Sequence, residues 1–267
     1  MERKQFSRPE RSRPKTNYLD FQAYLGATKH FGGMDATKDL LKLCQIRPGI
    51  SVLDIGCGVG ATSCFLAKQY GCQVVGIDLR SEMILRAREK AKTAGVEGRV
   101  SFRVTDAQNL PFASESFDLI ISESVATFIE DKKSLVTEYA RVTKQRGFVG
   151  LNEEIWVKSP PSSDYKEFMR KQMDVEPEIP LLKDWEAYLQ AAGLQDIAIQ
   201  VYETLDPQRE SSQKQCYGAR DYALLLSRML RLYVTNQSFR AHLKESKRRP
   251  KGLFGYLGYG IFVGRKI

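Results

Sequence analysis

The stretch Ser51-Val-Leu-Asp-Ile-Gly-Cys-Gly-Val-Gly-Ala61 decides the fold of this chain. Val52, Leu53 and Ile55 suit a buried parallel strand, and the glycines after them let the backbone turn tightly and approach a ligand closely. The following run, Ala61–Tyr70, is typical of a helix. A helix that begins just beyond such a loop presents free backbone N–H groups to a ligand. The stretch therefore predicts a nucleotide-binding strand, loop and helix.

The spacing of the glycines separates the two classes of cofactor that use this arrangement. A dinucleotide-binding loop reads G-x-G-x-x-G, whereas Gly56, Gly58 and Gly60 here give G-x-G-x-G. Asp54 precedes the first glycine, where a carboxylate would lie close to a pyrophosphate but could meet a cationic group. This favours a cationic cofactor without phosphates. S-adenosylmethionine (SAM) fits, since it has a sulfonium, an ammonium, a ribose diol and an adenine, and a dinucleotide stays as the alternative.

Further motifs follow the loop along the chain. Val74–Asp78 predicts a second strand that ends in an acid, which could accept hydrogen bonds from both ribose hydroxyls. Val100–Val104 predicts a third strand, and the turn after it begins with Asp106-Ala107. Ser116–Glu123 and Gly147–Glu153 predict the fourth and fifth strands.

This ordered set of motifs resembles the class I SAM-dependent methyltransferases over roughly residues 17 to 204. The resemblance implies an α/β fold with a Rossmann-like, mostly parallel sheet of seven strands, helices on both faces and an antiparallel last strand. It also implies SAM as the cofactor and the small-molecule group that acts on quinones, sterols, phosphoethanolamine or arsenite. The residues that it implies for cofactor binding are Asp54, Gly56, Cys57, Gly58, Gly60, Asp78, Leu79, Met83, Asp106, Ala107 and Glu123.

The sequence predicts a single methyltransferase domain, residues 17–267, with two additions. Residues 1–16 are expected to form a basic, flexible tail. A helical insertion at about 205–255 separates the last two predicted strands, and its run Ala219–Val234 carries apolar residues at spacings of three and four. We expect this insertion to be a lid over the carboxyl edge of the sheet. Met and aromatic residues at 165–173 add to the prediction of a partly apolar acceptor site.

Methyl transfer from a sulfonium is an in-line displacement, which needs a base only where the acceptor must lose a proton. Glu123 is the first candidate, because it ends the fourth predicted strand. Glu153 is the second, and since Glu154 beside it points to the opposite face, only one of the two can face the site. His30 is the third, and lies in Tyr18–Met34, which resembles the segment that folds over SAM in small-molecule methyltransferases.

Composition excludes several other classes. No apolar run approaches the roughly 20 residues of a membrane span, and the basic N-terminus lacks the apolar stretch of a secretory signal, so a cytoplasmic protein is expected. The five cysteines have no metal-ligand spacing, so we expect reduced packing residues and no metal. They also give no convincing match to the cysteines of arsenite enzymes. The net charge is +9, and basic clusters near both ends could follow phosphates or a membrane surface.

These observations predict a SAM-dependent methyltransferase of a small-molecule acceptor, of amphipathic or lipid-like character. Two alternatives stay open: an RNA methyltransferase that uses the basic tail, and a noncatalytic SAM-binding module. The first is disfavoured because Ser122-Glu123-Ser124 stands where enzymes acting on base amines carry a Pro-Pro-aromatic turn. The acceptor atom, peripheral contact with a membrane and the oligomeric state are left open by the sequence.

Overall fold

The computed structural model describes residues 18–26, 30–158, 167–168, 170–171, 178–203, 219–246 and 255–267. The predicted tail, residues 1–16, lies outside the described residues. So do residues 204–218 and 247–254 of the predicted insertion, and the Met and aromatic residues of 165–173 other than Phe168. No helix in the described part of the chain is long and apolar enough to cross a membrane.

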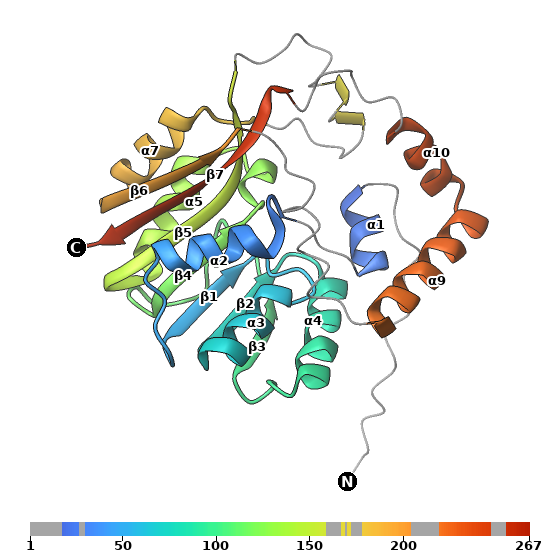
Figure 1. The fold of residues 1–267 in the computed structure, drawn as a ribbon, viewed down its shortest axis with the longest axis horizontal. Coiled ribbons are helices and arrows are strands. Elements are labelled where there is room, and N and C mark those ends of the chain that lie inside the picture. The colour runs from blue at the N-terminus through green and yellow to red at the C-terminus, as the bar shows by residue number, and fades with distance from the viewer. Residues whose placement is uncertain are drawn as a thin grey trace.

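Seven strands form one sheet in the order β3-β2-β1-β4-β5-β7-β6 (Figure 1). The first five strands pair in parallel, and β7 runs antiparallel to both of its neighbours, β5 and β6. This confirms the predicted fold class. The strands are β1 (Ser51–Ile55), β2 (Gln73–Asp78), β3 (Val100–Val104), β4 (Phe117–Glu123), β5 (Thr143–Trp156), β6 (Leu194–Tyr202) and β7 (Leu257–Lys266).

Strand β5 is longer than the predicted Gly147–Glu153. It continues to Trp156 because β7 pairs with it along that whole length, from Phe148 opposite Arg265 to Trp156 opposite Leu257. The carboxyl end of β5 therefore projects beyond β4, which ends at Glu123.

Helices cover both faces of the sheet. One face carries α2 (Gly33–Leu43), α3 (Ala61–Tyr70) and α4 (Ser81–Ala94), and the other carries α5 (Lys132–Val142) and α7 (Leu182–Ala191). A short 3₁₀ helix, η1 (Ala126–Phe128), follows β4 on the second side. Below, these are the α2 face and the α5 face.

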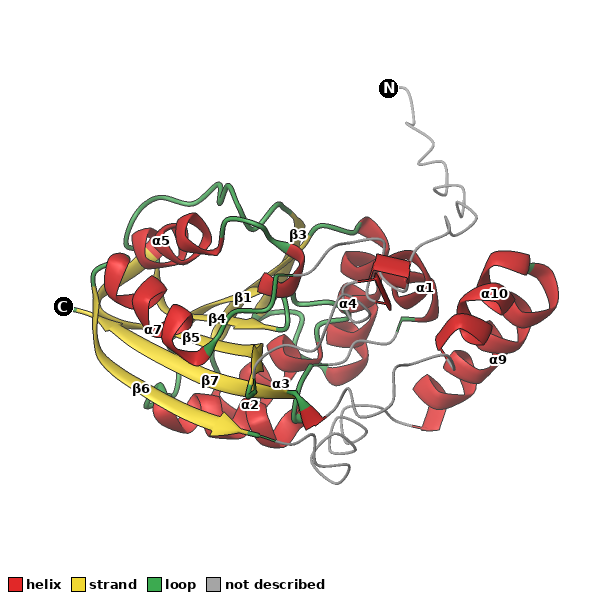
Figure 2. Cartoon of the chain, turned by 90° about the horizontal axis from the view of Figure 1, so that it is seen from above, coloured by secondary structure: helices red, strands yellow, loops and turns green. Residues whose placement is uncertain are grey.

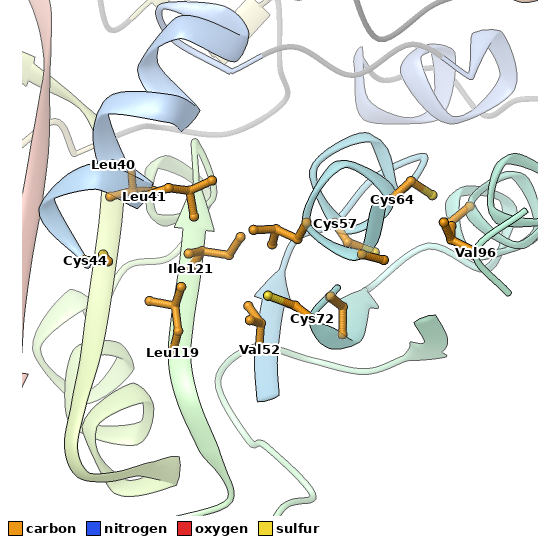
Figure 3. Close-up of a cluster of buried hydrophobic side chains, with 14 of the residues drawn as sticks. Leu40, Leu41, Cys44, Val52, Cys57, Cys64, Cys72, Val96, Leu119 and Ile121 are labelled. Carbon is orange, nitrogen blue, oxygen red and sulfur yellow. The ribbon is translucent and has the colours of Figure 1, made fainter. Parts of the chain in front are cut away.

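The core of the α2 face joins α2 and α3 to the central strands (Figure 3). Leu40 and Leu41 of α2 pack over Ile121 of β4, all three fully buried. Four of the five cysteines, Cys44, Cys57, Cys64 and Cys72, lie in this core with free thiols, whereas Cys216 lies outside the described residues. Their burial matches small packing residues.

Three further helices, α1 (Tyr18–Leu25), α9 (Ala219–Thr235) and α10 (Gln237–Ser246), stand beside the sheet and its covering helices (Figures 1 and 2). Helix α1 lies between α4 and the α9–α10 pair. The ring of Phe21 in α1 packs edge-on against that of Phe239 in α10, with ring centroids 5.1 Å apart. Helices α9 and α10 come between β6 and β7 in the chain. That they act as a lid stays a prediction.

Candidate functional site

The glycine-rich loop connects β1 to α3 at the carboxyl edge of the sheet. Gly56, Gly58 and Gly60 all have positive φ, which favours glycine. At Gly56 a side chain is also excluded, because a Cβ there would lie 2.3 Å from Cγ2 of Val125, just after β4. The backbone N–H of Gly58 donates to Oδ2 of Asp78 over 3.0 Å and so ties the loop to the end of β2.

Two carboxylates predicted to hold the cofactor flank this loop. Asp78 is half-buried, accepts a second hydrogen bond from the backbone N–H of Arg80, and has its pKa raised by burial. Asp54 is buried on the α2 face, where its Oδ2 accepts a 2.5 Å hydrogen bond from the hydroxyl of Ser63. Burial, with help from the nearby charges of Glu123 and Asp78, raises the pKa of Asp54 to about 7.

Helix α1 closes over the same loop. Ala23 of α1 packs with Val59 of the loop and with Met83 of α4, all buried. The guanidinium of Arg80 pairs with Asp20 of α1, which fixes the helix beside the end of β2. Met83 is thus placed under α1.

Other predicted cofactor residues lie differently. The side chain of Leu79 is 67% exposed. Cys57 packs in the core, and burial together with the charges of Asp54 and Asp78 raises the pKa of its thiol, so the thiolate is not favoured.

The turn after β3 lies beside Asp78, because the backbone N–H of Thr105 donates to the carbonyl of Asp78 over 3.0 Å. Asp106 is exposed, and its Oδ1 accepts from the backbone N–H of Gln108 over 2.9 Å. Ala107 is half-buried and packs against the core of the α5 face. The turn therefore stands next to the carboxylate that closes the glycine loop.

Glu123 and His30, two of the three predicted bases, are brought together on the α2 face. Nε2 of His30 lies 3.5 Å from Oε1 of Glu123, and their side chains are 8% and 6% exposed. The hydroxyl of Thr37 donates to Oε1 of Glu123 over 2.9 Å, and that of Thr62 donates to Oε2 over 3.0 Å. Thr37 also lies 2.9 Å from Nε2 of His30, whose ring donates to the carbonyl of Gly33. The carboxylate of Glu123 therefore accepts hydrogen bonds from both α2 and α3.

The segment between α1 and α2 is held over the ends of β4 and β5. The side-chain amide of Asn152 donates to the carbonyl of Phe31 over 2.8 Å, and the backbone N–H of Phe31 donates to the hydroxyl of Ser124 over 3.3 Å. The ring of Phe31 stacks on that of Tyr259 of β7, with centroids 6.2 Å apart. His30 therefore has a defined place next to Glu123.

Glu153, the third predicted base, is not brought to this group. It lies on the α5 face with 0% exposure, and its Oε1 accepts from the backbone N–H groups of Val125 and Ala126 over 3.1 and 3.2 Å. Its neighbour Glu154 points to the α2 face, the side of Glu123 and Asn152, and is 5% exposed. Burial raises the pKa of each of these carboxyls to about 8.

Three residues of this site were missed by the sequence-based prediction: Thr62, Ser63 and Asn152. Thr62 and Ser63 are the second and third residues of α3, directly after the glycine loop. Their position could have pointed to them, since a helix that starts at the carboxyl edge directs its first turn to that edge. Asn152 pairs with Glu123 in the parallel register of β4 and β5, and this register is not visible in the sequence.

Comparison with known proteins agrees with this geometry. Residues 53–151 match a family model described as a methyltransferase domain. An uncharacterized protein of Haemophilus influenzae is 32% identical over 182 residues, which cover 67% of this chain and 72% of the relative. Phosphoethanolamine N-methyltransferase 1 of Arabidopsis thaliana is 32% identical over 157 residues, 57% of this chain and 32% of that protein. This chain thus spans about a third of the length of that enzyme.

The chain belongs to the SAM-dependent methyltransferases. With the family come the enzyme class, EC 2.1.1, and the cofactor, S-adenosylmethionine. The fold agrees: phosphoethanolamine N-methyltransferase 2 of Haemonchus contortus, solved with phosphomonomethylethanolamine and S-adenosylhomocysteine, superposes with a TM-score of 0.69 at 20% identity, over 96% of this chain and 58% of that chain.

The residues at the loop of this methyltransferase fit SAM. The clash that a Cβ at Gly56 would meet shows how closely the loop packs, and Asp54 and Asp78 supply carboxylates for a cationic, hydroxyl-bearing ligand. SAM supplies the electrophilic methyl group when it is bound.

Proposed function

We propose that this methyltransferase transfers the methyl group of SAM to a small amphipathic acceptor whose nucleophile is an amine. The observation that carries the proposal is Glu154, a buried carboxylate at the carboxyl edge of the α2 face. Among the described residues, no side chain or backbone N–H donates a hydrogen bond to it. A buried carboxylate without a partner is costly, so a cationic or proton-donating ligand is the group that this position favours.

The surroundings of Glu154 suit an amphipathic molecule. Tyr259 stands opposite Glu154 on β7, and Trp156, two residues further along β5, points to the same face. Trp156 packs with Ile179 and Leu257 in a small apolar cluster beyond the edge of the sheet. The ammonium of an acceptor would meet the carboxylate and the aromatic rings, and its apolar part would meet this cluster.

An ammonium must lose its proton before its nitrogen can attack the methyl group. Because the pKa of Glu154 is raised to about 8, its carboxyl gives up its own proton near that pH, and the resulting carboxylate is a stronger base than an exposed glutamate and is suited to take the proton of the ammonium. Glu123 and His30 stand on the same face and would relay the proton or stabilise the remaining charge. The relatives that are named as phosphoethanolamine N-methyltransferases agree with a nitrogen acceptor.

The proposal is tested with methyl-labelled SAM and two matched acceptor series, amphipathic primary amines and the corresponding alcohols. Labelled amines and unlabelled alcohols are expected. Glu154→Gln should raise KM for the amine about tenfold or more while calorimetric SAM affinity is unchanged, since one charged hydrogen bond is worth roughly 1.5–3 kcal/mol. Glu153→Gln is the control, because it changes an adjacent, equally buried carboxyl on the other face. Labelling of alcohols alone, or equal KM values in the two variants, would contradict the proposal.

A further inference from the structure

The apolar face of helix α9 is only partly covered by the neighbouring helices. Leu232 is 2% exposed and packs with Phe21 of α1 and Phe239 of α10. Four large apolar residues lie further round the helix and face away from these partners: Leu226, Leu230, Tyr233 and Val234, which are 65%, 65%, 55% and 67% exposed.

These four residues, called the α9 stripe below, form one surface. Leu230 follows Leu226 by four residues, and Tyr233 and Val234 follow Leu230 by three and four, so the side chains lie on one side of the helix over successive turns. Monomeric proteins rarely leave contiguous apolar surface of this kind in water. In Figures 1 and 2, α9 and α10 form the outer margin of the molecule, beyond α1, so the stripe is accessible to a large partner.

The same part of the chain carries most of its net positive charge. Residues 219–251 contain nine Lys or Arg and two acidic residues, a net charge of +7, and residues 1–16 contain six and two, a net +4. Because the whole chain carries +9, all the remaining residues together carry −2. Among the described residues of this segment, Arg231, Arg240 and Lys244 are exposed. The apolar stripe is therefore bordered by cations.

We infer that α9 and α10 are a docking surface for an anionic lipid bilayer. An exposed amphipathic helix with aliphatic and aromatic residues on one side and basic residues around it binds in the interface of a membrane, where apolar burial and attraction to anionic headgroups add. Long basic side chains at the border reach the headgroups while their stems stay on the apolar surface. The surface thus has both components that such binding requires.

The charge and apolar character of this surface favour an anionic bilayer over a second copy of this chain or a nucleic acid. A second copy of this chain, docked through the same stripe, would bring two segments of net charge +7 together, and like charges oppose that contact. A nucleic acid would satisfy the charge but would leave the aliphatic stripe in water. An anionic bilayer satisfies both.

The test is co-sedimentation of the full chain with vesicles of phosphatidylcholine alone or of phosphatidylcholine with phosphatidylserine. Binding to the phosphatidylserine vesicles is expected, weakening as salt is added, with little binding to phosphatidylcholine alone. The double variant Leu226→Glu/Leu230→Glu should bind about tenfold more weakly or worse. Leu224→Glu is the matched control, because Leu224 is 40% exposed on the same helix but lies on the side away from the stripe; it should bind like the wild type.

Calorimetric SAM binding and circular dichroism show that each variant is folded, and neither depends on the acceptor, so failure here is separate from failure of the proposed function. The inference is overturned if the wild type does not sediment with phosphatidylserine vesicles at low salt, or if the double variant binds as well as Leu224→Glu. It is also overturned if light scattering shows a wild-type dimer that the double variant dissociates while vesicle binding is absent, since the occupant is then a second copy.

Discussion

The two faces of the sheet bury carboxylates of the same kind at the same edge, with different results. On the α5 face, Glu153 accepts two backbone hydrogen bonds from the start of η1 and supports the backbone that carries Val125 over Gly56. On the α2 face, Glu123 accepts hydrogen bonds from the hydroxyls of Thr37 and Thr62, and Glu154 accepts from no described residue. A carboxylate that holds backbone is part of the scaffold, whereas one held by side chains at a sheet edge is available for chemistry.

The largest expected effect is a difference in kcat between a variant on the α2 face and a variant on the α5 face. Glu123→Gln keeps the shape but removes the charge beside His30 and so breaks the relay proposed to carry the proton away from Glu154; kcat should fall about 100- to 10,000-fold, the range for loss of general acid–base catalysis. Glu153→Gln, which keeps the accepting Oε1, should change kcat little. Steady-state kinetics with a labelled methyl donor measure both. Equal losses would show that Glu123 has only a structural role.

The next effect concerns the loop that joins the faces. Gly56→Ala and Gly95→Ala both place a side chain at positive φ, with values of 66° and 68°, so backbone strain of about 1–2 kcal/mol is common to both. Only at Gly56 does the new Cβ meet another side chain, that of Val125; at Gly95 nothing lies within 4 Å.

Calorimetry should therefore show SAM binding about 10- to 100-fold weaker for Gly56→Ala, as expected from an overpacking cost of about 1–3 kcal/mol. Gly95→Ala should keep wild-type affinity, and its Tm should fall less than that of Gly56→Ala, because only the backbone strain is present. Unchanged affinity in both variants would place SAM away from this loop.

The glycine loop was the part of the site best predicted from the sequence, and the hydrogen-bond network around Glu123 was the part predicted least well. The helix at Ala61–Tyr70 and the strand at Val100–Val104 have the predicted bounds, because local periodicity and flanking turns define them. Thr37 reaches Glu123 across 86 positions in the chain, and Asn152 reaches Phe31 across 121. Such contacts depend on how the helices pack on the sheet, and this packing cannot be deduced from the spacing of residues in the sequence.

The choice between Glu153 and Glu154 shows the same limit. Alternation along β5 predicted that they face opposite sides. Which side faces the site depends on which face α2 covers, and this is set by tertiary packing. The exposure of the α9 stripe likewise depends on the partners of α9: the apolar pattern was visible in sequence, but an apolar face is more often packed than exposed.

A third effect concerns pH and the shared burial of Glu153 and Glu154. Each has a pKa of about 8 in the folded protein against an ordinary value of 4.5, so the folded protein holds protons that the unfolded chain releases. This stabilisation is fully present below the unfolded pKa and is lost as pH rises through about 8. The free energy of unfolding should therefore fall between pH 5 and pH 8, by on the order of 1 kcal/mol per pH unit for each carboxyl.

Denaturant titrations at several pH values measure this slope. Glu153→Gln and Glu154→Gln should each flatten it, because a neutral amide has no proton to lose. Both carboxyls have a pKa of about 8, so a similar flattening is expected from each variant. Slopes identical to the wild type in both variants would show that these carboxyls are ionised in the folded protein.

The smallest expected effect is on the free energy of unfolding, and it is measured by changing one tyrosine on each face of the sheet. Tyr202 of β6 donates to Oδ2 of Asp39 in α2 over 2.7 Å, and its ring stacks on Tyr259 with centroids 4.5 Å apart. Tyr202→Phe keeps the stack and removes the hydroxyl, so the free energy of unfolding should fall by about 1 kcal/mol. Tyr188→Phe is the control: it keeps the edge-on contact of the ring with Trp185, and its half-buried hydroxyl bonds to no described residue. If Tyr188→Phe costs as much as Tyr202→Phe, the hydroxyl of Tyr202 does not tie β6 to α2, and the segment over Glu123 is held by Asn152 and Ser124 instead.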